Sequence, residues 1–311
     1  MDALARAALT RWPVAVKNLV LVARRENNVW RVEAENGRIF ALRMHRKGYR
    51  NCAELRSELA WMEILSRGGA RVPVPIPSHA SGLVVEGDGV FLDLLSWLPG
   101  TPLGKSGMAL GLADPHAVFF NFGRAMAGLH ALSDSWQRPA WFTRPVWDVD
   151  GLLGETPVWG RFWENPALDS KARKVITAAR QKARIALHAR ARNLDYGLVH
   201  ADLVRENVLV NGGQVEFIDF DDGGFGFRLF DVATALLKNR NEPDYGGLEA
   251  ALLSGYRSLR PLDSSMLSLF TLLRAFTYLG WIMPRIEEPG ALSRCQRYVA
   301  ESVALAEVWL D

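Results

Sequence analysis

The first part of the chain shows the period-two pattern of β-strands. Residues 19–22 form an apolar run, residues 29–33 alternate between apolar and polar positions, and residues 38–44 form a third strand-like stretch. Asn36-Gly37 separates the last two, and this dipeptide is a strong hairpin signal because both residues tolerate positive φ. The pattern therefore predicts three antiparallel strands.

A helical period follows these strands. The predicted helix over residues 53–67 carries four apolar residues on one face, namely Leu55, Leu59, Met62 and Leu65, and Gly68-Gly69 ends it. Two further strands are predicted at residues 82–86 and 90–97. Together with a short first helix that stops near Pro13, these elements outline a small lobe over residues 1–97.

The chain after Pro102 is mainly helical. The periodicity predicts helices over residues 116–132, 170–192, 229–238, 247–259, 264–283 and 292–310. One strand pair interrupts them, at residues 207–210 and 215–219, joined by Asn211-Gly212-Gly213. We therefore predict an α+β fold with an antiparallel-sheet lobe at 1–97 and a helical lobe at 98–311.

Composition and charge exclude several classes of protein. The net charge of +3 is weak support for a polyanionic partner, and no apolar stretch approaches the length needed to span a bilayer. The helix over residues 170–192 is basic, but its charges spread over several faces without interleaved aromatics, which favours a solvated surface. Cys52 and Cys295 fit neither a disulfide framework nor a metal site. We expect a cytoplasmic protein with no nucleic-acid or membrane partner, and the sequence leaves its oligomeric state open.

The chemistry is concentrated in one segment. His200, Asp202 and Asn207 form the pattern H-x-D-x₄-N, and Asp219 follows twelve residues after Asn207. Phosphoryl transfer needs one carboxylate beside the acceptor hydroxyl, and an amide and a second carboxylate that hold Mg²⁺ against the phosphates. The strand pair would return Asp219 to the side of Asn207, so that two oxygen ligands suited to Mg²⁺ converge.

At these residues the chain resembles the aminoglycoside phosphotransferase, choline kinase and homoserine kinase group, the small-molecule relatives of protein kinases. The family loop reads roughly H-G-D-x-x-x-x-N, and Ala201 stands at its glycine. The resemblance implies a bilobal protein-kinase-like fold, with Asp202 as the catalytic base and Asn207 and Asp219 as Mg²⁺ ligands. It also implies that ATP binds between the lobes.

Two charged residues of the small lobe are candidates for holding the phosphates. Arg43 lies on the third strand at the position of the kinase lysine that pairs the α- and β-phosphates. Glu58, on the following helix, is its expected partner, with Glu54 as the fallback. The alternative is that Arg43 is a surface strand residue, because it alternates outward from Leu42 and Met44, and that both acids are solvated.

Two segments of the small lobe are candidates for contacting the nucleotide. The turn Arg25-Glu26-Asn27-Asn28 lacks the glycines of protein kinases, but an asparagine can adopt positive φ and donate to phosphate, so we predict Asn28 near the phosphates. Leu95, Ser96 and Trp97 resemble the hinge, where backbone groups would bind the adenine edge.

Other residues admit a structural interpretation beside a functional one. His200 and Asp231 are expected to support the catalytic segment, as their family counterparts do. Asp221 and Asp222 could tune a metal or bind a cation, or simply form a turn, and Arg274 could reach a substrate carboxylate or a structural acid. Five tryptophans could line a ligand site or pack the loop: Trp136, Trp141, Trp147, Trp159 and Trp163.

The sequence thus predicts an ATP- and Mg²⁺-dependent kinase of a small-molecule hydroxyl, such as an amino alcohol, a hydroxy amino acid or an aminoglycoside. A protein Ser/Thr kinase is one rival, but only a dozen residues separate Asp219 from Asp231, which leaves little room for an activation segment. A nucleotide-binding pseudokinase is the other, and the intact Asp202, Asn207 and Asp219 argue against it.

Overall fold

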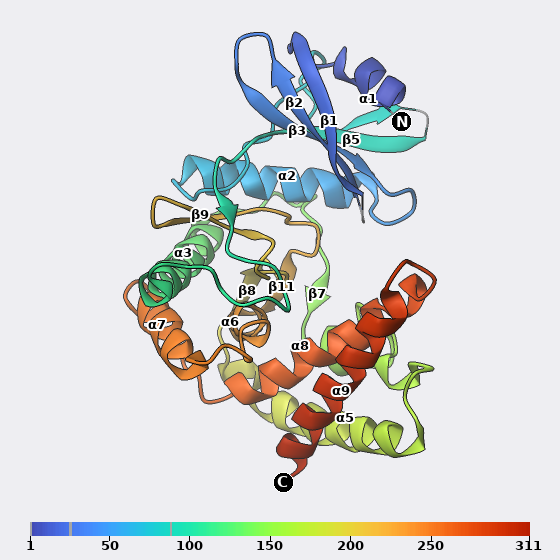
Figure 1. Cartoon of the computed structure of the whole chain (residues 1–311), viewed down its shortest axis with the longest axis vertical. Helices are drawn as coiled ribbons and strands as arrows, with labels where there is room; N and C mark the ends of the chain where they lie inside the picture. The colour runs from blue at the N-terminus through green and yellow to red at the C-terminus, as the bar shows by residue number, and fades with distance from the viewer. Residues whose placement is uncertain (1, 25–26, 88) are drawn as a thin grey trace.

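The predicted antiparallel sheet is confirmed. The computed structural model describes residues 2–24, 27–87 and 89–311, and its first sheet has the order β1-β2-β3-β5-β4 with every neighbouring pair antiparallel (Figure 1). The strands are β1 (Val16–Arg24), β2 (Asn27–Ala34), β3 (Ile39–His45), β4 (Val85–Gly87) and β5 (Val90–Ser96). Gly37 adopts φ 79° in the turn between β2 and β3, as the Asn-Gly dipeptide predicts.

The two faces of this sheet have different environments. Trp30, Leu42 and Leu94 point to one face, where they form a small core with Leu9 of α1 (Asp2–Leu9). Side chains alternate along a strand, so Arg43 and Asp93 point to the other face. Helix α2 (Cys52–Arg67) lies on that side, between the sheet and the rest of the molecule (Figure 1).

Helix α2 joins the two parts of the protein. An Asn51–Glu54 capping box fixes its N-terminus, since each side chain bonds to the other residue's backbone N–H. Trp61 packs edge-on against Phe220 at 5.1 Å between ring centroids and donates from Nε1 to Ser133 Oγ at 2.8 Å. The apolar face of α2 is therefore part of the large core below the sheet.

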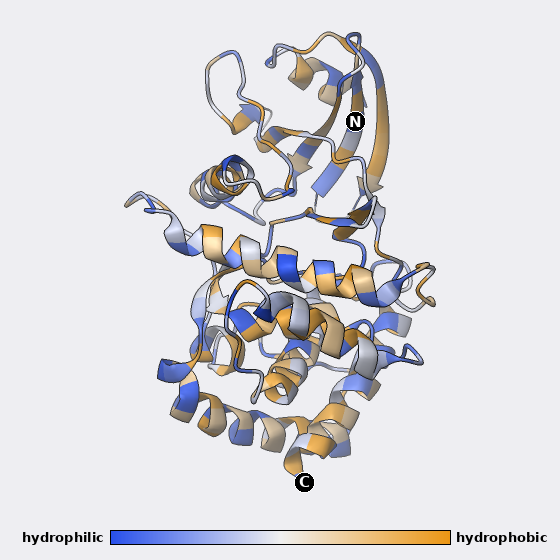
Figure 2. Ribbon diagram, turned by 90° about the vertical axis from the view of Figure 1, so that its left-hand side faces the viewer, coloured by the Kyte–Doolittle hydropathy of each residue, from blue (hydrophilic) through white to orange (hydrophobic). Residues whose placement is uncertain are grey.

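The larger part is helical, as predicted. Its helices are α3 (Pro115–Ser135), α4 (Val149–Leu153), α5 (Ser170–Arg190), α6 (Arg228–Leu237), α7 (Tyr245–Arg257), α8 (Leu267–Trp281) and α9 (Ala291–Leu310), with short 3-10 turns η1 (Phe162–Glu164), η2 (Ala191–Asn193) and η3 (Met283–Arg285). Hydrophobic and hydrophilic stretches alternate along them (Figure 2). Among the described residues, no helix combines the length and apolar character needed to cross a bilayer.

Two small sheets stand among these helices. One has the order β10-β9-β6 and the other β7-β11-β8. Their strands are β6 (Thr101–Pro102), β7 (Val146–Trp147), β8 (Tyr196–Val199), β9 (Val208–Asn211), β10 (Gln214–Phe217) and β11 (Gly224–Phe227). The predicted strand pair is the β9–β10 hairpin, and the segment with the H-x-D-x₄-N pattern connects β8 to β9.

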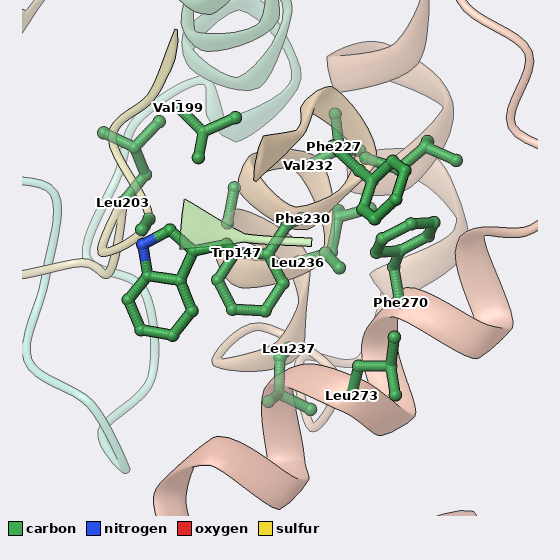
Figure 3. Close-up of a cluster of buried hydrophobic side chains, with 14 of the residues drawn as sticks. Trp147, Val199, Leu203, Phe227, Phe230, Val232, Leu236, Leu237, Phe270 and Leu273 are labelled. Carbon is green, nitrogen blue, oxygen red and sulfur yellow. The ribbon is translucent and has the colours of Figure 1, made fainter. Parts of the chain in front are cut away.

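A dense aromatic core lies beneath this connection (Figure 3). Trp147 stacks on Phe230 of α6 with 5.4 Å between ring centroids, and Phe227 meets Phe270 of α8 at 5.5 Å. Because these rings come from β7, β11, α6 and α8, the core fixes those elements relative to the strands that carry the candidate site.

Candidate active site

Asp231 holds the backbone of the candidate catalytic segment. Its carboxylate accepts the N–H groups of His200 (2.8 Å) and Ala201 (2.6 Å) and also bonds to His130 Nε2 at 3.0 Å. Ala201 adopts φ 65°, a left-handed conformation that favours glycine and explains the glycine in the family loop. The structural role expected for Asp231 therefore has a geometric basis.

The Asp202 carboxylate is held at both oxygens. Oδ2 accepts from Asn207 Nδ2 at 2.8 Å, and Oδ1 accepts from Arg274 Nη2 at 2.5 Å. Asp202 remains 26% exposed, whereas Arg274 is 3% exposed, so the carboxylate can still meet a molecule arriving from solvent. The sequence left open whether Arg274 contacts a substrate carboxylate or an acidic residue of the protein. In the structure it contacts an acidic residue, Asp202.

His200 supports the segment from below, as expected. Its ring is fully buried against Phe220, with 4.4 Å between centroids, and Nε2 donates to the carbonyl of Ile218 at 3.0 Å. Nδ1 then accepts the Asp202 N–H at 3.4 Å. Burial lowers the pKa of His200, so a neutral imidazole links Asp202 to the segment before Asp219.

Asp219 and Asn207 are brought together by the β9–β10 hairpin. The Ile218 N–H bonds to the Asn207 carbonyl at 3.0 Å, and Asp219 adopts a left-handed φ of 67°, which aspartate tolerates better than most residues. Desolvation by the surrounding protein, and then the carboxylates of Asp221 and Asp202, raise the pKa of Asp219 well above its usual value. Its side chain is nevertheless exposed to solvent. Asp202 and Asp221 have arginine partners, but within the described residues Asp219 has no ion-pair partner, and such a carboxylate among other carboxylates is suited to a divalent metal.

Arg43 lies at the centre of a buried ionic cluster. Its Nη1 donates to Glu58 Oε1 at 2.7 Å, and its Nε and Nη2 donate to the two oxygens of Asp93, both at 2.8 Å. Nη1 also lies 3.5 Å from Asp221 Oδ1. With 5% of Arg43 exposed, the interpretation as a surface arginine is wrong, because α2 covers the face to which it points.

Asn27, rather than Asn28, belongs to this cluster. The Asn27 amide donates to Asp221 and lies 3.1 Å from His45 Nδ1, while His45 Nε2 lies 2.7 Å from Asp93 Oδ2. Asn28 is a half-buried residue of β2 on the same face as Trp30, the face away from Arg43. Neither asparagine has positive φ, so the predicted turn role for Asn28 is wrong; Arg25 and Glu26 lie outside the described residues.

Two members of the cluster carried no motif signal. Burial alone would raise the pKa of Asp93, but Arg43 and then His45 overcome it and lower that pKa to about 2. Arg144 is buried and bonds from Nη1 to Glu58 Oε2 at 3.4 Å and from Nη2 to the carbonyls of Phe220 and Asp221. The sequence indicated a special role for Asp93 only in that a charged residue interrupts the apolar run of β5. Arg144 lies in an irregular loop, where no sequence pattern marks it.

The backbone donors of the predicted hinge are already used. The Ser96 N–H bonds to the Val74 carbonyl at 2.8 Å, and the Trp97 N–H bonds to the Ile39 carbonyl at 3.1 Å. Leu95 is buried and pairs with Ala41 and Pro75 on its two sides. An adenine edge could therefore not receive a hydrogen bond from Ser96 or Trp97, and a donor must come from beyond Trp97.

Several other candidates have structural partners. Trp147 and Trp163 are buried in the core, which favours packing over ligand binding for these two. Asp222 accepts from Tyr49 (3.2 Å) and Arg50 (3.3 Å). On the basic helix α5, Arg173 and Arg180 donate to backbone carbonyls of the preceding segment: Trp163, Asn165, Leu168, Leu153 and Gly154.

Known proteins share this fold. A family described as the phosphotransferase enzyme family matches residues 19–262. The structure of a microcompartment-associated aminopropanol kinase superposes with a TM-score of 0.85 and 31% identity, over 100% of this chain and 98% of that one. An amicoumacin kinase bound to AMP-PNP and Ca²⁺ superposes with a TM-score of 0.78 and 20% identity, over 97% and 93%.

A homoserine kinase of Chelativorans sp. is similar in sequence. It is 28% identical over 235 residues, which cover 73% of this chain and 67% of that protein. The family match spans both the sheet with Arg43 and the segment with Asp202, Asn207 and Asp219. The chain therefore belongs to the phosphotransferase enzyme family and is an ATP-dependent kinase that phosphorylates a hydroxyl group of a small molecule.

Proposed function

We propose that Asp202 orients the acceptor hydroxyl and takes its proton as the phosphoryl group is transferred. The supporting observation is that Asp202, Asn207 and Asp219 converge at one end of the β9–β10 hairpin, with Asp202 fixed at both oxygens yet open to solvent. A base held in this way loses little freedom when the acceptor arrives, and such positioning is the main source of catalysis in phosphoryl transfer.

Asn207 and Asp219 would hold Mg²⁺ in this account. Within the described ranges, no group of three or more His, Cys, Asp or Glu side chains is arranged to hold a metal ion on its own. Two protein ligands suffice for Mg²⁺, because the ion keeps several waters and takes its remaining ligands from substrate phosphates. When bound, it would neutralise charge on the β- and γ-phosphates. The amicoumacin kinase neighbour binds AMP-PNP together with Ca²⁺, which agrees with a nucleotide and a divalent cation at one site.

Arg43 is the proposed phosphate-binding cation, held by Glu58 and Asp93. Three of the five guanidinium N–H groups are used by those two carboxylates, so the fork is fixed before a nucleotide arrives. For the adenine edge we propose the Ser96 carbonyl and the Leu98 N–H, which makes no hydrogen bond within the described residues. Residues 1–97 would then form the nucleotide-covering lobe, and residues 98–311 the catalytic lobe.

The acceptor is proposed to be a small amino alcohol, hydroxy amino acid or aminoglycoside-like molecule. The similar proteins are kinases named for aminopropanol, homoserine and amicoumacin. We place the reaction in a reducing cytoplasm, because both cysteines, Cys52 and Cys295, are free thiols.

A screen of ATP consumption tests this proposal. Purified protein with ATP and Mg²⁺ is offered amino alcohols, hydroxy amino acids, sugars and aminoglycosides, and ADP release is followed beside ³¹P NMR of the product. We expect a phosphomonoester from one of these classes, and product formation roughly 10²- to 10⁴-fold slower with Asp202→Asn under the same conditions. Acceptor-independent ATP hydrolysis, equal in the wild type and Asp202→Asn, would contradict the proposal.

A further inference from the structure

Lys238 is a largely buried cation with few polar partners. It is the C-cap residue of α6, and its side chain is only 14% exposed. Within the part of the chain that the structure describes, its ammonium donates no hydrogen bond, and Glu301 Oε2 is a distant ion-pair partner at 4.0 Å. An ammonium withdrawn from water needs acceptors for its protons, and an anionic ligand would supply them.

Aromatic rings take the place of those acceptors. The Lys238 Nζ lies 3.8 Å from the ring centroid of Tyr278 and 4.9 Å from that of Tyr298, and the two rings are stacked on each other. Burial lowers the pKa of Lys238 to about 8, although Glu301 opposes this. The ring faces stabilise the charge, but among the described residues neither tyrosine hydroxyl accepts a hydrogen bond from Lys238.

Tyr278 connects Lys238 to the proposed catalytic base. The Arg274 guanidinium lies 4.4 Å from the Tyr278 ring centroid, and its Nη2 lies 3.1 Å from the Tyr278 hydroxyl. The same Nη2 bonds to Asp202. Asp202 is also among the charges that act on Lys238. Tyr278 and Arg274 therefore connect Lys238 to the carboxylate of Asp202, beside which the acceptor hydroxyl is proposed to lie.

We propose that Lys238, over the Tyr278 ring, is the binding site for a carboxylate on the acceptor, which makes the physiological acceptor a hydroxy acid or hydroxy amino acid. This inference rests on the proposed role of Asp202. A purely cationic amino alcohol would leave the Lys238 ammonium without an acceptor, whereas a carboxylate would supply one.

A carboxylate fits this subsite better than a phosphate. The charges acting on Lys238 include three carboxylates, those of Glu301, Asp202 and Glu206. A dianionic group would be repelled by these carboxylates twice as strongly as a monoanion in the same position. The site therefore disfavours a doubly charged anion more than a singly charged one, and the nearby carboxylates would attract the ammonium group of a hydroxy amino acid.

Matched acceptor pairs test the inference. Steady-state kcat/KM is measured with L-serine and ethanolamine, L-threonine and 1-aminopropan-2-ol, and L-homoserine and 3-aminopropan-1-ol; the members of each pair differ only in the carboxylate. We expect the acid of the best pair to be preferred, and Lys238→Met to lower that preference by roughly 10- to 100-fold, the usual effect of losing a hydrogen bond to a charged group. In Lys238→Met the KM for the acid should rise and the KM for ATP should stay unchanged. Lys238→Arg should retain part of the preference for the acid.

The control is Lys174→Met, which removes an exposed lysine of α5 and should leave the preference intact. Preference for the amino alcohol, no turnover with any acid, or a Lys238→Met effect on the KM for ATP would each overturn the inference. Asp202→Asn is assayed in parallel on the best acceptor. If Asp202→Asn is inactive but Lys238→Met keeps the wild-type preference for the acid, only the carboxylate site is rejected. If Asp202→Asn is active, the proposed base is rejected.

Discussion

At the scale of single residues, the carboxylate of Asp202, the proposed base, is held by contacts from distant parts of the sequence. The motif predicted Asp202, Asn207 and Asp219, because phosphoryl transfer needs these side chains at this spacing. Arg274 lies 72 residues after Asp202, and the sequence alone did not indicate that the two side chains bond to each other. Such a contact depends on where α8 lies against the β8–β9 connection, and periodicity does not specify this packing.

The same limit explains the error at Asn28. The turn composition pointed to an asparagine near the phosphates, but which of two adjacent asparagines faces Arg43 depends on strand register. A shift of one residue moves a side chain to the other face of the sheet. The register Asn27↔His45 puts Asn27 on the Arg43 face.

Asp202→Asn should lower kcat by roughly 10²- to 10⁴-fold, the usual contribution of a positioned general base. Asparagine keeps the shape of the side chain and can still accept from the buried Arg274 guanidinium, so the fold should persist. Acceptor-dependent ADP release gives kcat, and circular dichroism with thermal unfolding checks the fold. Retention of most of the wild-type kcat would show that another group serves as the base.

The second prediction at this scale concerns the pair Arg43 and Glu58. Arg43→Ala and Glu58→Ala should each lower kcat/KM, and the double variant should lose less than the two losses combined, because the residues contact each other directly. Arg43→Ala should be the more damaging, since it also removes both guanidinium hydrogen bonds of the buried Asp93 carboxylate.

Arg31→Ala is the matched control for this cycle. Arg31 lies on the neighbouring strand β2, and its pair with Glu33 is partly exposed, at 3.7 Å. Exposed pairs of this kind are typically worth ~0–1 kcal/mol, so kcat/KM should scarcely change. Small and additive kinetic effects for Arg43→Ala and Glu58→Ala would refute a shared role in holding the phosphates.

At the scale of elements, most boundaries could be predicted to within a few residues. Helix α2 runs over Cys52–Arg67, against a predicted 53–67, because its apolar period and the glycines that end it are local signals. The backbone N–H groups of Ser96 and Trp97, in the predicted hinge, are already hydrogen-bonded for a non-local reason. The proline-rich connector pairs with β5 and takes the Ser96 N–H, and no local pattern indicates that pairing.

The buried His130 makes the contacts among three helices sensitive to acid. Its ring connects α3 to Asp231 of α6 and, through Nδ1 at 2.7 Å, to the Tyr256 hydroxyl of α7. Burial, and then the charge of Arg228, lower the pKa of His130 to about 4. The unfolded chain binds this proton below pH ~6.5 and the folded chain only near pH 4, so the stabilisation is lost as the pH falls between these values.

His130→Gln should therefore flatten the pH dependence of stability. Between pH 6.5 and 4, the slope of the unfolding free energy against pH should decrease by up to about 1.4 kcal/mol per pH unit. Glutamine can still bond to Asp231 but does not titrate. Urea unfolding at several pH values measures the slope, and an unchanged slope in the variant would exclude His130 as a source of the acid sensitivity.

At the scale of the whole molecule, α2 and Arg144 couple the sheet to the catalytic elements. Glu58 of α2 bonds to Arg43 on the sheet side and to Arg144 on the other, and Arg144 reaches the carbonyls beside Asp219. The order of elements predicted two lobes with nucleotide chemistry between them. It could not predict that one glutamate, Glu58, bonds to both Arg43 and Arg144, because these residues lie 15 and 86 positions from it.

The division of labour between Asp202 and Asp219 is the central claim, and Mg²⁺-dependent nucleotide affinity tests it most directly. Isothermal titration of AMP-PNP at saturating Mg²⁺ is compared for the wild type, Asp202→Asn and Asp219→Asn; asparagine tolerates the left-handed backbone of residue 219. The account predicts affinity within a few-fold of the wild type for Asp202→Asn and a loss of at least ~10-fold for Asp219→Asn, as expected when a charged ligand of a metal is removed. Equal affinity for Asp219→Asn and the wild type would contradict it.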